Sequence, residues 1–184
     1  MKSLSLGFRK LRVVDIVVLG IFMSLLLILG RFTVGVQSWR LSFGFVVTAI
    51  ASMLYGPLWS STIAALTDII GTLMSGSVYF PGFTISAILG AAIYGYFFYG
   101  KEITWKRVII AQLIIAVVVN AILNTYWLTI LYKTWLTILY KTPFWAFLPV
   151  RALKELVMTP IQMAILYYML NSQTMSNIQS RLFK

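Results

Sequence analysis

Long apolar runs separated by short polar or glycine-containing segments dominate this chain of 184 residues. A helix that crosses the hydrocarbon core needs about 20 mostly apolar residues, because the core is about 30 Å thick and each residue rises about 1.5 Å. By this measure we expect an all-α integral membrane protein with a bundle of six transmembrane helices. The expected helices cover residues 13–30, 41–54, 58–74, 80–99, 108 to beyond 126, and 148–170. Tyr55-Gly56-Pro57 separates the second from the third and predicts a hinge.

Composition supports this assignment and narrows the functions. The chain is 60% hydrophobic and 10% charged, with a mean hydropathy of +0.91. Cys and His are both absent, so disulfides, thiolate or imidazole metal ligands and Ser-His or Cys-His nucleophilic pairs are excluded. We therefore expect neither an enzyme nor a cofactor. Nucleic acid is an unsuitable partner despite the net charge of +11, since Asp68 is the only charge between residues 41 and 100.

The cations indicate the topology, because cytoplasmic loops of membrane proteins are enriched in Lys and Arg. With six spans, both termini lie on one side, which then carries nine of the fifteen cations. These nine are Lys2, Arg9, Lys10, Arg12, Lys101, Lys106, Arg107, Arg181 and Lys184. We expect a single domain that spans a cell membrane, with residues 1–12 and 171–184 cytoplasmic. The six remaining cations on the outer side need another explanation.

A tandem repeat lies near the end of the fifth predicted helix, where WLTILYKT at residues 127–134 recurs at residues 135–142. Eight residues are too few for a solenoid unit. An additional eight residues would lengthen a helix by about 12 Å and rotate the later part of the chain by about 80°. We therefore expect the extra copy to be a loop rather than helix.

Two groups of outer cations are candidates for ligand binding. Arg31 and Arg40 flank a connection that contains Trp39, and this set suits an anionic ligand with an aromatic ring. Arg151 and Lys154 share one face of the sixth helix with Glu155, and intramembrane charges usually face a bundle interior or a cavity. In the alternative interpretation, Arg31 and Arg40 extend to lipid headgroups, and the charges on the sixth helix form a structural ion pair.

Amide and carboxylate side chains give further candidates within the bundle. Asn120, Asn124 and Trp127 have helical spacing and present hydrogen-bonding and stacking groups to one side. Their alternative role is hydrogen bonding between helices. Asp68 in the third helix needs a partner cation or a ligand donor, or else couples transport to protons. Gly20 and Ser24 in the first helix permit close approach of a neighbouring helix.

The segments Tyr55-Gly56-Pro57-Leu58-Trp59 and Tyr79-Phe80-Pro81-Gly82-Phe83-Thr84, together with Asp68, resemble S components of energy-coupling factor (ECF) vitamin transporters. The segment Asn124-Thr125-Tyr126-Trp127-Leu128, followed by Pro149-Val150-Arg151 and Lys154, is most similar to the folate-specific type. The similarity spans nearly the whole chain. The second WLTILYKT copy departs from the family pattern and leaves Trp127 and Trp135 as alternative equivalents.

The resemblance implies a membrane subunit that captures its vitamin at the outer face and works with a transmembrane T subunit and two cytoplasmic ATPases. It implies that Gly20 and Ser24 stand where the family has an Ala-x-x-x-Ala-type docking motif. It also implies folate as the ligand, with Asn120, Asn124 or Asp68 on the pterin edge and Trp39 or Trp127 stacked on the ring. Arg31, Arg40, Arg151 and Lys154 would then hold the carboxylates.

Three alternatives stay open at this point. The chain could be an S component for another vitamin, such as pantothenate or riboflavin. It could be a proton-coupled secondary transporter that uses Asp68 or Glu155 and needs no partner subunits. It could also be a structural or assembly subunit.

Overall fold

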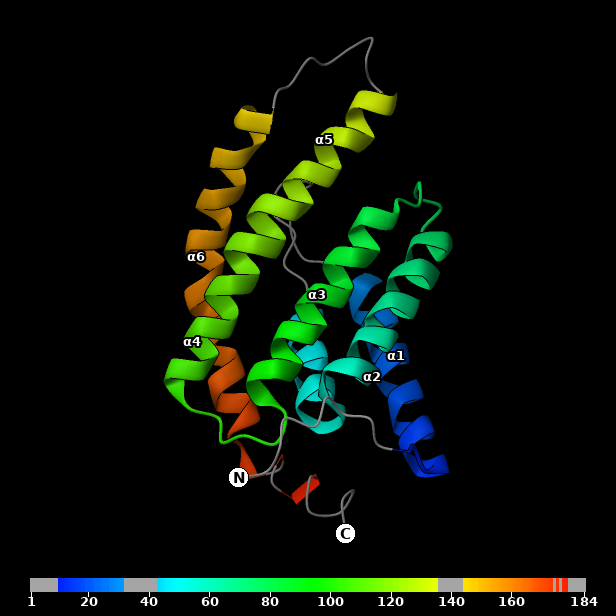
Figure 1. The fold of residues 1–184 in the computed structure, drawn as a ribbon, viewed down its shortest axis with the longest axis vertical. Helices are drawn as coiled ribbons and strands as arrows, with labels where there is room; N and C mark the ends of the chain where they lie inside the picture. Colours follow the sequence, from blue (N-terminus) through cyan, green and yellow to red (C-terminus); the bar gives the residue numbers. More distant parts are fainter. Residues whose placement is uncertain (1–9, 32–42, 136–143, 174, 176, 179–184) are drawn as a thin grey trace.

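The structure is a computed structural model that describes residues 10–31, 43–135, 144–173, 175, 177 and 178. Every regular element in this part of the chain is helical, in agreement with the all-α prediction. The elements are α1 (Val13–Arg31), α2 (Gly44–Met74), α3 (Pro81–Phe98), α4 (Trp105–Ile114), the π-helix η1 (Ile115–Leu123), α5 (Asn124–Trp135) and α6 (Phe144–Leu170). Figure 1 shows α3 between α1 and α2 on one side and α6 on the other.

Four helices in the described ranges are long and apolar enough to cross a membrane, namely Val13–Gly30, Gly44–Met74, Pro81–Phe98 and Trp105–Leu131. The first, fourth and fifth predicted helices therefore correspond closely to observed ones. The predicted count of six spans is not confirmed, because the second and third predicted helices belong to the single element α2.

The element α2 contains the predicted hinge. Gly56 has non-helical backbone angles of φ 79° and ψ 177°, a conformation open to glycine, and Pro57 follows it without a backbone N–H. Thr48 and Thr67 both line one cavity, although a straight helix would separate 19 residues by about 28 Å. The break at Gly56 therefore turns the chain back on itself, as Figure 1 shows in the cyan and teal parts of α2.

Helices α2 and α3 pack closely on both sides of this break. Ser52 and Ser61 of α2 donate hydrogen bonds of 3.1 Å to the backbone carbonyls of Ala91 and Ile88 in α3. A Cβ atom at Gly95 would lie 2.4 Å from the Cα atom of Pro57. The absence of a side chain at Gly95 therefore lets α3 pack directly onto the backbone at the bend.

The chain from Trp105 to Trp135 forms one rod of three segments, α4, η1 and α5, which packs against α6. Its centre, η1, has π-helical geometry, which occurs in proteins mostly as short insertions and frequently at functional sites. The first WLTILYKT copy and Trp135 are helical. Residues 136–142 of the second copy lie outside the described residues, so the predicted loop there stays a prediction.

One buried carboxylate was not singled out from the sequence. Asp15, in the first turn of α1, is fully buried, and its Oδ2 atom accepts a 2.8 Å hydrogen bond from the backbone N–H of Arg12. The Arg12 guanidinium Nε lies 3.5 Å from the same oxygen. A carboxylate in the first turn of a helix satisfies free N–H groups there, so Asp15 anchors the beginning of α1.

Candidate functional site

A cavity of about 420 Å³ lies inside the bundle, within the range of about 300–1,000 Å³ that small-molecule sites occupy. It reaches Asp68, near the end of α2, and Phe83, near the beginning of α3. The cavity is therefore near the end of the bundle where α2 connects to α3, which we call the α2–α3 end (residues 75–80). The side chains that line it from every helical element are Leu26, Phe45, Thr48, Ala64, Thr67, Asp68, Phe83, Ser86, Ala87, Ala91, Tyr94, Gln112, Ile115, Val119, Asn120, Asn124 and Gln162.

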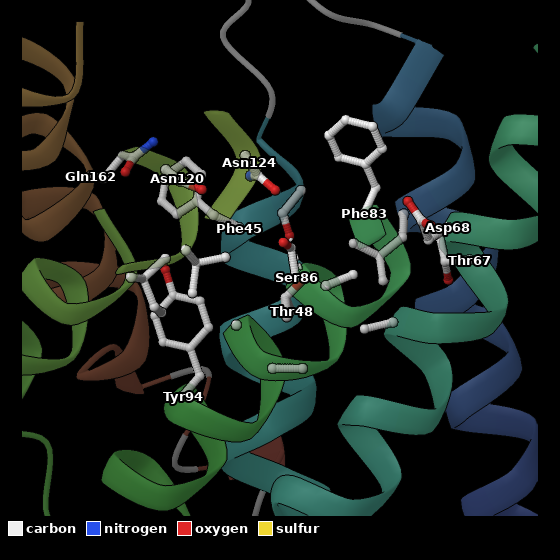
Figure 2. Close-up of a pocket in the computed structure, with 18 of the residues that line it drawn as sticks. Phe45, Thr48, Thr67, Asp68, Phe83, Ser86, Tyr94, Asn120, Asn124 and Gln162 are labelled. Carbon is white, nitrogen blue, oxygen red and sulfur yellow. Dashed lines mark hydrogen bonds between the residues drawn. The ribbon is translucent and has the colours of Figure 1, made fainter. Parts of the chain in front are cut away.

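The cavity combines aromatic surface with polar groups placed on opposite walls. Phe45, Phe83 and Tyr94 supply rings on which a flat ligand can stack. Figure 2 shows Asp68 on one side of the cavity and Asn120 and Gln162 on the other, with Asn124 between them. An apolar pocket with a few convergent polar groups is the usual form of a small-molecule site.

The carboxylate of Asp68 is held by a short relay of hydroxyl groups. Thr84 Oγ1 donates a hydrogen bond of 2.7 Å to Asp68 Oδ2, and the Tyr79 hydroxyl lies 3.0 Å from Thr84 Oγ1. The sequence predicted a cation or a ligand donor as the partner of Asp68, whereas this bond comes from a neutral hydroxyl. This contact brings no positive charge to Asp68, and the carboxyl oxygens can accept hydrogen bonds from ligand N–H groups.

Two side-chain oxygens of residues that line the cavity have no hydrogen-bond partner among the described residues. They are Thr67 Oγ1 and Asn124 Oδ1, and both are buried. A buried polar atom without a partner costs about 1–3 kcal/mol. A ligand that donates hydrogen bonds to these oxygens would recover that cost, so they are suited to an N–H-rich edge.

A chain of buried polar groups forms the wall where α3, α4 and α6 meet. Tyr94 donates its hydroxyl to Gln112 Oε1 at 2.6 Å, and Gln112 Nε2 donates to Gln162 Oε1. Tyr94 and Gln112 are almost completely buried. Because a hydrogen-bonded chain of this kind has a fixed order of donors and acceptors, it holds the three side chains in place beside the cavity.

Part of the polar face predicted for α6 makes contacts inside the bundle. Asn120 Nδ2 donates to Glu155 Oε2 at 3.2 Å, which joins η1 to α6. Gln162 faces the cavity, whereas Lys154 is half-buried and is not among the described residues that line it. Glu155 thus points into the bundle, as its place on this face predicts, and Gln162 does so as well.

The predicted site residues differ in how they relate to the cavity. Asp68, Asn120 and Asn124 line it. Trp127 lies against Phe80 and bonds Ser86, which lines the cavity, so the indole is behind the wall and not part of it. The side chains of Arg31 and Arg151, and the residues Trp39 and Arg40, lie outside the described part of the chain, so their roles stay predictions.

Sequence reasoning missed several residues of this site. Thr67, Ser86 and Tyr94 line the cavity, yet hydroxyl-bearing residues are common in membrane helices and carry no distinctive signal. Gln112 did carry one, because it is a lone amide within an apolar stretch, and polar side chains inside a membrane span are usually functional. Gly82 and Thr84 belong to the segment of residues 79–84 that resembles S components, but the resemblance did not indicate their contacts.

Comparison with known proteins agrees with this architecture. Residues 14–170 match the family model described as ECF transporter, substrate-specific component. The chain is 37% identical over 178 residues to the folate transporter FolT of Leuconostoc mesenteroides, covering 96% of this chain and 95% of the relative. It is 40% identical over 129 residues to FolT of Clostridium novyi, covering 70% of each chain. A crystal structure of FolT bound with folic acid superposes with a TM-score of 0.73 at 33% identity, covering 86% of this chain and 93% of that one.

Proposed function

Because this chain belongs to the substrate-specific components of ECF transporters, we propose that it is the folate-binding S component of an ATP-driven vitamin uptake system. One observation carries the choice of folate. The likeness to FolT extends over nearly the whole chain, and FolT has been crystallised with folic acid in a fold with a TM-score of 0.73 to this one. The cavity is the binding site in this proposal.

The chemistry of the cavity suits the pterin half of folate. A pterin is a flat ring whose amidic N–H and neighbouring amino group form an edge of hydrogen-bond donors. The cavity-lining residues Asp68, Thr67 and Asn124 carry acceptor oxygens, and Phe45 and Phe83 present aromatic faces. In this arrangement the donor edge meets the acceptors while the ring stacks on the aromatic side chains.

The benzoyl-glutamate half carries two carboxylates and extends toward the α2–α3 end. The candidate cations for these carboxylates are Arg31, Arg40, Arg151 and Lys154. Trp39, in the connection between Arg31 and Arg40, supplies an aromatic face in this proposal. Arginine holds carboxylates through paired hydrogen bonds, which makes it suited to this part of the ligand.

The orientation in the bacterial membrane follows from the cations. We count the two parts of α2 before and after Gly56 as separate spans, which makes six together with α1, α3, the rod and α6. Both termini and the connection with Lys101, Lys106 and Arg107 are then cytoplasmic, and the α2–α3 end faces outward. Folate is captured at the outer face in this orientation.

Energy for transport comes from partners in this proposal, namely a transmembrane T subunit and two cytoplasmic ATPases. Helix α1 is the docking surface, since only 11% of Val13–Gly30 is buried in this chain, against 61% of the most apolar 18-residue stretch of α2. Gly20 and Ser24 are both exposed there, and nothing lies within 4 Å of a Cβ atom built at Gly20. A partner helix can therefore approach the α1 backbone closely.

The test is a titration of the purified chain with folate, for which we expect a dissociation constant in the nanomolar range. Pantothenate and riboflavin should not compete at equal concentration. In liposomes, folate uptake should require ATP, the T subunit and the ATPases. Tight binding of another vitamin would reassign the substrate, and uptake by the chain alone under a pH gradient would indicate a proton-coupled transporter. A chain that bound no vitamin would contradict the proposal.

A further inference from the structure

The indole of Trp127 lies behind the cavity wall, in a recess of α3 at Gly82. A Cβ atom built at Gly82 would lie 2.5 Å from Trp127 Cδ2, 2.7 Å from Trp127 Cγ and 2.5 Å from Phe80 Cε1. Side chains never approach one another this closely, so only glycine at position 82 admits the indole. The ring centroids of Phe80 and Trp127 are 5.9 Å apart, and Phe80 thus closes one side of the recess.

The same indole makes a directed contact with the cavity wall. Trp127 Nε1 donates a hydrogen bond of 3.1 Å to Ser86 Oγ. Ser86 lies one helical turn after Gly82 on α3, is buried, and lines the cavity. The indole therefore lies along one turn of α3, from Gly82 to Ser86.

This contact sets the hydrogen-bonding role of Ser86. A hydroxyl has one O–H donor and two acceptor lone pairs, while an indole N–H only donates. Since Trp127 uses an acceptor position of Ser86, the serine O–H is directed elsewhere. Ser86 lines the cavity, and Figure 2 shows its side chain below Asn124, with Phe83 and Asp68 to its right.

From this geometry we infer that Ser86 is a ligand-contacting hydrogen-bond donor and that Trp127, seated in the Gly82 recess, is the positioning residue that orients it. The ligand atom it meets is an acceptor, such as a ring carbonyl or ring nitrogen of the pterin. Ser86 then complements Asp68, Thr67 and Asn124, which meet ligand donors. The inference rests on the proposed folate site and adds the acceptor side of its recognition.

The first test compares Ser86→Ala, Trp127→Phe and the double variant by folate titration of purified full-length protein. Loss of one buried hydrogen bond to the ligand should raise the dissociation constant about tenfold for Ser86→Ala. Trp127→Phe keeps an aromatic ring but cannot donate, and we expect a rise of about threefold to tenfold. In the Ser86→Ala background, Trp127→Phe should add no further loss, because its effect passes through the serine hydroxyl.

The second test addresses the recess. Gly82→Ala should displace the indole and weaken folate binding at least as much as Trp127→Phe, and Gly82→Ala combined with Trp127→Ala should bind no worse than Trp127→Ala alone. Gly71→Ala is the matched control, because a Cβ atom there meets only Leu27 Cδ2 at an ordinary 3.5 Å. Thermal unfolding of each variant in detergent separates lost binding from lost folding.

The outcomes distinguish this inference from the proposed function. Additive losses for Ser86→Ala and Trp127→Phe, or folate binding unchanged by Ser86→Ala, would overturn the inference while leaving a folate-binding protein. Absence of folate binding by the unmodified chain would instead overturn the proposed function. If Gly82→Ala fails to fold, the Ser86 and Trp127 cycle decides the inference by itself.

Discussion

The hydroxyl of Thr84 donates a hydrogen bond of 2.7 Å to the carboxylate of Asp68, and this bond joins α3 to α2 beside the cavity. The two residues are 16 positions apart and belong to different helices. Thr84 is buried, so the bond is largely protected from solvent. The contact fixes one carboxylate oxygen and thereby orients the other.

This relationship yields a prediction for ligand binding. Asp68→Asn should raise the dissociation constant for folate more than tenfold, because hydrogen bonds to a charged group contribute about 1.5–3 kcal/mol. Thr84→Val keeps the shape but removes the orienting donor, and we expect a rise of about fivefold. Titration of the purified variants measures both. Thr129→Val is the control, since the Thr129 hydroxyl bonds only within its own helix, to the Thr125 carbonyl, and should leave binding unchanged.

A second prediction concerns stability at the bend of α2. Gly95→Ala places a methyl group 2.4 Å from Pro57 Cα and 2.5 Å from Pro57 N, and backbone atoms cannot move aside as a flexible side chain can. Overpacking of this kind costs about 1–3 kcal/mol, so the melting temperature in detergent should fall by several degrees. Gly30→Ala, with nothing within 4 Å, should not lower it. Equal melting temperatures for the two variants would contradict the close packing of α3 on the bend.

A third prediction tests the serine contacts between α2 and α3. Ser52→Ala and Ser61→Ala each remove one hydrogen bond between helices, and such bonds in membrane bundles contribute about 0.6 kcal/mol on average. The double variant should therefore lose about 1 kcal/mol in the free energy of unfolding, measured by denaturant titration in detergent. Thr62→Ala removes a bond within α2 only, to the Leu58 carbonyl, and serves as the control. A loss in Thr62→Ala as large as in the double variant would count against a specific role for the serines.

A fourth prediction addresses partner docking on α1. Gly20→Leu or Ser24→Leu should prevent co-purification with the T subunit and the ATPases, because a large side chain blocks close approach of a helix. Folate binding by the isolated chain should not change, since neither residue lines the cavity. Val14→Leu enlarges another exposed position of α1 and is the control. Normal assembly of the Gly20→Leu and Ser24→Leu variants would place the docking surface elsewhere.

Residues of the candidate site were predictable only where the side chain is of a type that is costly to place inside a membrane span. Asp68, Asn120 and Asn124 were identified because a carboxylate or amide is costly in an apolar span and usually has a function. Ser86 and Thr67 were not, because a hydroxyl can bond its own helix backbone and so fits a membrane span anywhere. Trp127 was expected to stack on the ligand, and its contact with Ser86 and Gly82 depends on the mutual rotation of α3 and α5.

The sequence by itself determined where the membrane helices lie, because the length and apolar character of a span are local properties set by the bilayer. It also determined the break at Gly56 and Pro57, since both residues act on the backbone directly. The tertiary structure alone decided that α2 doubles back to line one cavity twice, that the rod contains a π-helix, and that Asp68 meets Thr84. These features depend on how helices rotate and pack against one another. The sequence does not show this, because helix surfaces that face lipid and surfaces that face a neighbouring helix are both apolar.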